Sequence, residues 1–82
     1  MMGKRELSIS MIFNSVQFGT DIFACRKELG MTGEAVAELI PVDKSALYKY
    51  EKGLQDNMKM QNFLAICNLY DLDPRRYFEL ER

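Results

Sequence analysis

The side chains best suited to binding a ligand gather between residues 44 and 52. Three lysines, a serine and a tyrosine lie there at helical spacing, namely Lys44, Ser45, Tyr48, Lys49 and Lys52. Residues three and four positions apart share one side of a helix. Ammonium and hydroxyl groups on such a face donate hydrogen bonds outward. We therefore treat this face as the candidate binding surface and ask which elements hold it in place.

Catalysis is disfavoured by what the chain lacks. Its 82 residues include no His. His is the commonest metal ligand and the usual general base near neutral pH, so metal-assisted hydrolysis and Ser/His or Cys/His chemistry lose their main component. We expect a single domain without enzyme activity, catalytic residues, metal or cofactor.

The two cysteines, Cys25 and Cys67, are too few for a disulfide framework. The N-terminus does not resemble a signal peptide, because polar residues interrupt the apolar run that should follow Lys4 and Arg5. No stretch approaches the roughly 18 apolar residues of a membrane span. The expectation is a reduced, cytoplasmic protein without membrane association, whose cysteines pack as small core side chains.

Apolar spacing predicts two helices before residue 41. The first carries an i, i+4, i+7, i+11 stripe and should end at Gly30; its apolar residues are Phe18, Ile22, Cys25 and Leu29. Thr32 is a good N-cap for a second, short helix. That helix turns Ala35, Val36 and Leu39 inward and must stop near Ile40, because a residue before proline avoids the α region.

Three more helices are predicted after Pro41, which we expect at the second position of a β-turn. Asp43 caps the third helix, and Gly53 closes it. The fourth helix has its core stripe at Met60, Phe63, Leu64, Cys67 and Tyr70. Asp73-Pro74 opens a short fifth helix whose apolar residues, in the core or at a dimer seam, are Tyr77, Phe78 and Leu80. The predicted fold class is all-α with five helices.

The N-terminal segment has a different period. Leu7, Ile9, Met11 and Phe13 alternate along residues 7–13, which favours a strand. Such a strand either pairs with its copy in a second subunit or lies against the helices as an ordered arm. We therefore divide the chain into an N-terminal arm at 1–15 and a helical domain at 16–82.

The second and third helices form a recognisable unit across residues 32–53. Two short helices joined by a three- or four-residue turn place the second helix in the DNA major groove. Ala37 is small where the helices must approach, and Ile40, Val42 and Leu47 supply the apolar wedge between them. The face that carries Lys44, Ser45, Tyr48, Lys49 and Lys52 is then not needed for packing in the core.

Four segments resemble one family at matching spacing. They are Arg-Lys-Glu-Leu-Gly-Met-Thr at 26–32, the small Ala37, Ser-Ala-Leu-Tyr-Lys-Tyr-Glu-Lys-Gly at 45–53, and Ile-Cys-Asn-Leu-Tyr-Asp-Leu-Asp-Pro at 66–74. From about Phe18 to Leu80 the chain is similar to the Cro/repressor (XRE-type, lambda-repressor-like) helix-turn-helix family of phage and bacterial regulators. The resemblance implies a five-helix DNA-binding domain.

The resemblance also implies roles for single residues. Arg26 and Glu51 match the family's structural salt bridge between helices one and three. The residues that match groove-facing positions are Asp43, Lys44, Ser45, Tyr48 and Lys49. Lys44 would donate to guanine, and Ser45 to base edges or a phosphate. Lys49, Lys52 and the NH groups from Thr32 to Glu34 would contact phosphates.

The sequence departs from the family at the turn and just after the Thr cap. Gly33 stands where the family usually has Gln, and Pro41 stands where it commonly has Gly. The net charge is −1, yet residues 41–53 carry three lysines against two acidic residues. The small positive excess therefore lies on the third helix and the N-terminal arm.

The predicted function is sequence-specific binding of double-stranded DNA by a transcriptional regulator. A repressor would bind a palindromic operator as a homodimer through a recognition helix at about residues 43–52. Its seam is either the fifth helix and C-terminus or the 7–13 strand. The alternative is a protein-interaction module on the same fold, such as an antitoxin, antirepressor or adaptor, which the net charge and the missing Gln favour. Steeply salt-dependent retention on heparin or DNA distinguishes the two.

Overall fold

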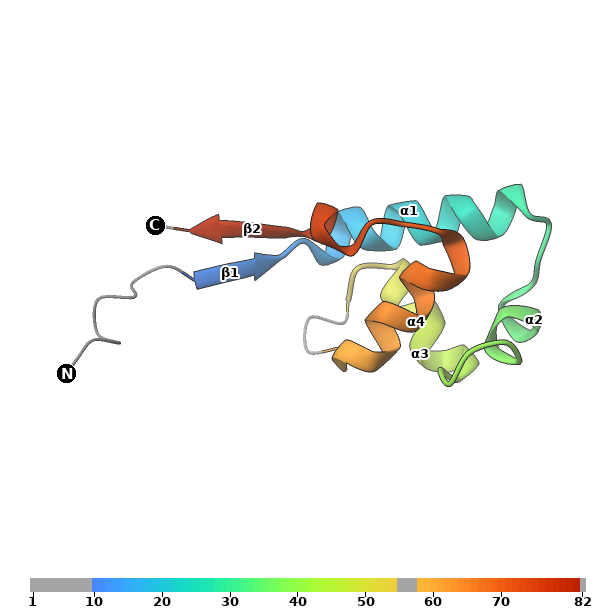
Figure 1. Cartoon of the computed structure of the whole chain (residues 1–82). Helices are drawn as coiled ribbons and strands as arrows, with labels where there is room; N and C mark the ends of the chain where they lie inside the picture. Colours follow the sequence, from blue (N-terminus) through green and yellow to red (C-terminus); the bar gives the residue numbers. More distant parts are fainter. Residues whose placement is uncertain (1–9, 55–57, 82) are drawn as a thin grey trace.

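The computed structural model describes residues 10–54 and 58–81. Its elements, in chain order, are β1 (Ser10–Phe13), α1 (Ser15–Glu28), α2 (Gly33–Ala37), α3 (Lys44–Glu51), α4 (Met60–Tyr70), the 3-10 helix η2 (Pro74–Tyr77) and β2 (Phe78–Glu81). The four α-helices form a body, and the two strands run out from it side by side (Figure 1). This arrangement leaves α3 with one side turned away from α1 and α4.

Glycines end α1 and α3 as the sequence predicts. Gly30 has a φ of +68° and Gly53 a φ of +72°, the left-handed conformation that follows many helices. After Gly53, the Leu54 N–H donates to the Lys49 carbonyl at 3.1 Å, which satisfies one of the orphan carbonyls of the last turn. The C-terminal ends of α1 and α3 are thereby fixed by local sequence.

The core lies where α1, α3 and α4 meet. Its fully buried side chains include Phe18, Ile22, Val36, Leu47, Ile66 and Tyr77. At Gly19 the helices come so close that an added Cβ would lie 2.5 Å from the Tyr50 carbonyl oxygen. Four residues of the predicted apolar stripes are exposed instead. Leu29 (59%) and Leu39 (60%) lie beyond the last residues of α1 and α2, Met60 (56%) is the first residue of α4, and Leu64 (46%) lies on the outer side of α4.

The predicted fifth α-helix is wrong. Asp73 caps a single 3-10 turn, with its Oδ1 accepting from the Arg75 N–H at 3.0 Å, and the chain extends after Tyr77. Tyr77 is completely buried, and its hydroxyl donates to Asp21 at 2.7 Å. A continued helix would carry Phe78 away from Phe13, whereas extension pairs the two residues in one sheet.

The strand expected within residues 7–13 is present as β1, and residues 7–9 lie outside the described part of the chain. Within the chain it has a strand partner that was not expected, and pairing with a second copy through its other edge stays a prediction. β1 pairs antiparallel with β2 of the same chain, with Met11 opposite Leu80 and Phe13 opposite Phe78. The domain is therefore mostly helical with a two-stranded sheet, rather than all-α.

Candidate nucleic-acid interface

Two of the candidate DNA-contacting residues are helix caps. Thr32 Oγ1 accepts from the Ala35 N–H at 3.1 Å and starts α2. Asp43 Oδ1 accepts from the Ala46 N–H at 2.8 Å and starts α3. A carboxylate in this position offsets the positive end of the helix dipole. The Asp43 carboxylate is thus already used as the cap at the start of α3.

The turn between α2 and α3 is tighter than the expected β-turn. The Val42 N–H donates to the Ile40 carbonyl at 2.8 Å, an i to i+2 bond that closes a γ-turn centred on Pro41. Proline holds φ near −65°, close to the value of the inverse γ-turn. Val42 is buried directly after the turn, so this bond and the apolar anchor together set where α3 begins.

The outward face of α3 presents cations and a hydroxyl. Ser45, Lys49 and Lys52 are exposed. Lys44 is half exposed and paired, because its Nζ lies 2.9 Å from Glu34 Oε2 at the start of α2. That hydrogen bond raises the pKa of Lys44 and lowers the pKa of Glu34. No local sequence signal identifies Glu34 as a partner, since ten residues and a turn separate it from Lys44.

Tyr48 packs on α2 instead of standing free on the α3 surface. A Cβ added at Gly33 would lie 2.5 Å from Tyr48 Cζ, so the ring occupies the space where a side chain at residue 33 would begin. The ring also lies beside Arg26, whose guanidinium carbon is 5.6 Å from the ring centroid. The Tyr48 ring therefore fills the space at residue 33, where the family usually has Gln. The sequence alone gives no link between Gly33 and Tyr48.

Arg26 joins α1 to α3 through a two-pronged ion pair. Its Nε lies 2.8 Å from Glu51 Oε2, and its Nη2 lies 3.0 Å from Glu51 Oε1. A third bond runs from Nη1 to the Met31 carbonyl at 3.0 Å. The two side chains are only 10% and 5% exposed. This parallel geometry is the strongest form of an arginine–carboxylate contact and fixes α3 against α1.

The structure thus sorts the candidate residues by position. Ser45, Lys49, Lys52 and the paired Lys44 form the outward face of α3, which we call the α3 face. Thr32 and Asp43 border it as caps, and Tyr48, itself on α3, packs against α2 at Gly33. Within residues 10–54 and 58–81, no three acidic, Cys or His side chains come together as metal ligands. The helices of that same part of the chain are all too short or too polar to cross a membrane.

Comparison with known proteins agrees with this geometry. The helix-turn-helix domain family matches residues 17–78, about three quarters of the chain. The chain belongs to this family, the class that the α2–turn–α3 unit defines.

The solved structures that resemble this chain include one that matches over most of its length. It is the restriction-modification controller protein C.AhdI from Aeromonas hydrophila, with a TM-score of 0.64 and 29% identity, covering 76% of this chain and 88% of that chain. No curated protein matches the sequence. Family and neighbour together support a DNA-binding transcription regulator.

Proposed function

We propose that the protein is a sequence-specific repressor that binds a palindromic operator as a homodimer, with α3 in the major groove. The observation that carries the proposal is the α3 face, which holds outward-facing cations while both ends of its helix are capped and its inner side is locked to α1. Helix-turn-helix domains present their second helix to base edges in this way. Repression follows where the operator overlaps the site that the transcription machinery needs.

The exposed side chains divide into two roles. Lys49 and Lys52, on the later turns of α3, contact phosphates and set the register of the domain without reading sequence. Ser45 and Lys44, on the first turn, reach base edges. Thr32 sits at the neighbouring start of α2, where its hydroxyl proton reaches a phosphate. Asp43 and Tyr48 act on this contact indirectly, through the cap and the packing described above.

Lys44 must exchange partners to read a base. In the free protein its ammonium group is held by Glu34 at 2.9 Å. Guanine O6 and N7 replace that carboxylate when α3 enters the groove. We expect Glu34→Gln to raise affinity for unrelated DNA more than affinity for the operator, because the freed ammonium group then attracts any phosphate. Equal affinities of wild type and Glu34→Gln for both DNAs would refute the exchange.

The small number of exposed cations on the α3 face supports a homodimer. Each neutralised phosphate contributes about −0.9 to the slope of log K against log salt, so a single domain with few contacts binds weakly at physiological salt. Two domains on one palindrome add their contacts, and their recognition helices then lie about 34 Å apart, one turn of DNA.

The test begins with selection of bound sites from a random DNA pool, since a recovered palindrome reports binding and symmetry together. Affinity for that site is then measured by fluorescence anisotropy at several salt concentrations. We expect Lys49→Ala to lower the salt slope by about one per protomer and Lys44→Ala to relax preference at one base position.

Arg75→Ala is the matched control, because it removes one exposed cation from η2, where Arg75 pairs with Asp73 at 2.9 Å. Equal losses in all three variants would contradict the assignment to α3. Retention on heparin that does not fall with salt, together with no recovered site, would favour the protein-interaction module. Two observations favour the protein-interaction module, namely the pairing of Lys44 with Glu34 and the net charge of −1.

A further inference from the structure

The two-stranded sheet is small and projects from the helical body (Figure 1). Each strand has four residues, and among the described residues no third strand pairs with either edge. A two-stranded sheet of this kind is marginally stable in water unless something else packs on it or pairs with it. An open strand edge is also a ready template for another strand.

The hydrogen-bond pattern shows which groups of β1 face the open edge. The Asn14 N–H donates to the Tyr77 carbonyl at 2.7 Å, and this pair continues the register of the sheet. In an antiparallel ladder every second residue bonds to the same neighbour. Ser10 and Ile12 therefore bond to β2, whereas the N–H and C=O groups of Met11 point away from it. The same holds for Leu80 on the outer edge of β2.

Charge distinguishes the two edges. β2 reads Phe-Glu-Leu-Glu, and two antiparallel copies of it side by side would bring the exposed Glu79 of one chain next to Glu79 of the other. Like charges across adjacent strands destabilise a sheet. β1 reads Ser-Met-Ile-Phe and carries no charge, no proline and no lysine, the residues that usually protect an edge. An antiparallel pairing of β1 with itself is therefore free of this repulsion.

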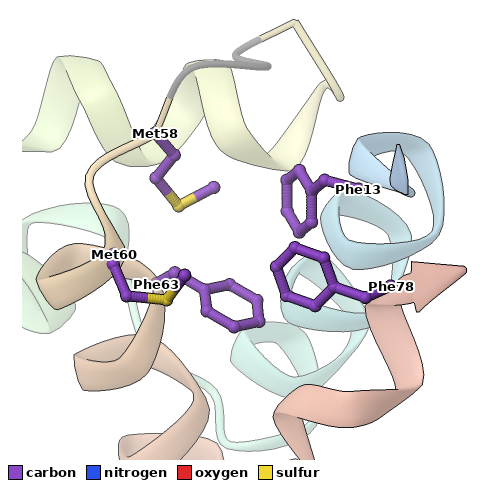
Figure 2. A pocket seen from close by; sticks show the side chains of 5 residues that line it. All are labelled: Phe13, Met58, Met60, Phe63 and Phe78. Atoms are coloured by element: carbon purple, nitrogen blue, oxygen red, sulfur yellow. The ribbon is translucent and has the colours of Figure 1, made fainter. Parts of the chain in front are cut away.

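The same strand is apolar on both faces. Met11 is 62% exposed and Ile12 46% exposed. Met11 shares a face with Phe13, which lines an open apolar pocket of about 130 Å³ between the sheet and the start of α4; the other lining residues are Met58, Met60, Phe63 and Phe78 (Figure 2). An antiparallel copy of β1 centred on Ile12 sets its own Met11 opposite Phe13, beside this pocket. Methionine adapts well to such irregular spaces.

We propose that β1 pairs antiparallel with β1 of a second copy, which gives a four-stranded sheet in the order β2–β1–β1–β2. The occupant of the edge is a second copy of this chain because an uncharged strand with exposed apolar residues complements itself. The acidic β2 strands then lie at the outer edges, where charge prevents further pairing. The inference rests on the homodimer of the proposed function and names its seam.

Proline substitutions test the edge without breaking the arm. Met11→Pro removes an N–H that points away from β2, and proline is tolerated at such edge positions. It should leave the folded domain intact and weaken dimerisation about tenfold or more, since symmetry removes two hydrogen bonds at once. Leu80→Pro is the matched control on the other edge and should leave the dimer unchanged. Sedimentation equilibrium of the full chain without DNA measures both.

A cross-link gives a second readout that does not depend on a damaging substitution. Under mild oxidant, Ile12→Cys or Met11→Cys should form a disulfide-linked dimer, because a two-fold axis beside β1 brings one of these residues against its own copy. Val16→Cys, equally exposed but on α1, should not, and wild type controls for Cys25 and Cys67.

Each outcome separates this seam from the proposed function. A dimer that survives Met11→Pro, is lost in Leu80→Pro, or cross-links at neither strand position overturns the β1 seam, and operator binding by that dimer would leave the proposed function standing. A β1-dependent dimer that shows no salt-sensitive DNA binding supports the seam and refutes the proposed function. A wild type that is monomeric at about 100 µM overturns the seam directly. Its dissociation constant would then be higher, and its binding weaker, than a specific interface provides.

Discussion

Removing the carboxylate of Glu51 should destabilise the domain more than any surface substitution. Glu51→Ala takes away two of the three hydrogen bonds of Arg26, those at 2.8 and 3.0 Å, and leaves the bond to the Met31 carbonyl at 3.0 Å. The guanidinium group stays between the rings of Phe23 and Tyr48, at 5.5 and 5.6 Å from their centroids. It cannot recover water easily, because the side chain is only 10% exposed.

The size of the loss follows from this geometry. Leaving one member of a buried ion pair without its partner costs about 3–5 kcal/mol. The remaining bond to Met31 and the two aromatic rings still favour the charged guanidinium, so we expect the lower end of that range, about 3 kcal/mol. A domain of this size has a total stability of roughly 4–12 kcal/mol. Glu51→Ala should therefore remove a large part of it.

Urea unfolding followed by circular dichroism measures the effect, with Arg26→Met, Glu51→Ala and the double variant compared at neutral pH. The double variant buries no unpaired charge, so its loss of stability should be smaller than the sum of the two single losses. We expect a coupling free energy of about 2 kcal/mol or more. Glu28→Ala, on the exposed side of α1, should stay within about 0.5 kcal/mol of wild type. Single losses below about 1 kcal/mol, or strict additivity, would refute the reasoning.

Three further substitutions have defined outcomes in the same unfolding assay. Tyr70→Phe should raise the free energy of unfolding by about 1 kcal/mol, because the Tyr70 hydroxyl is buried without a hydrogen-bond partner. Burial, and then the charge of Glu51, raises the pKa of Tyr70 to about 12, so wild type should lose stability between about pH 10 and 12. The variant should lose less over that range, because the raised pKa values of Cys67 and Tyr77 still contribute while that of Tyr70 no longer does; an unchanged alkaline loss would contradict this. Gly19→Ala should cost about 1–3 kcal/mol, since its Cβ would lie 2.5 Å from the Tyr50 carbonyl oxygen, and an unaffected midpoint would show that α1 and α3 separate freely. Asp71→Gly should stabilise by about 0.5–1 kcal/mol because Asp71 has a φ of 58° at the end of α4; a loss would mean that its side chain makes a contact worth more than the strain.

Local chemistry made the helix-turn-helix unit predictable. Thr32 and Asp43 can accept the orphan amides of a helix start, and Gly30 and Gly53 can adopt the positive φ of a helix end. Each of these signals acts within four or five residues of its position. The order and rough extent of α1, α2, α3 and α4 could therefore be predicted, apart from the C-terminal end of α2.

The parts that were missed depend on contacts between distant residues. The alternation of Phe78, Glu79, Leu80 and Glu81 is present in the sequence, yet a proline at a good helix start outweighed it. Only the pairing with β1, 65 positions earlier at Phe13, decides in favour of a strand. The same applies to Glu34 and to the Gly33–Tyr48 contact, because neither the ion pair nor the filled space exists before α2 folds against α3.

These tertiary contacts bear on how a chain of net charge −1 can select a DNA site. Non-specific affinity depends on the total of exposed cations, which is small on the α3 face. Lys44 contributes little to that total while Glu34 holds it, and it contributes fully only where a base acceptor replaces the carboxylate. Under the proposed function, the pair therefore lowers binding to unrelated DNA more than binding to the operator, which is how a competing contact produces specificity. In that proposal, the affinity given up in this way comes from a second α3 face on the same operator, and so the specificity of α3 and a dimer seam outside α3 stand or fall together.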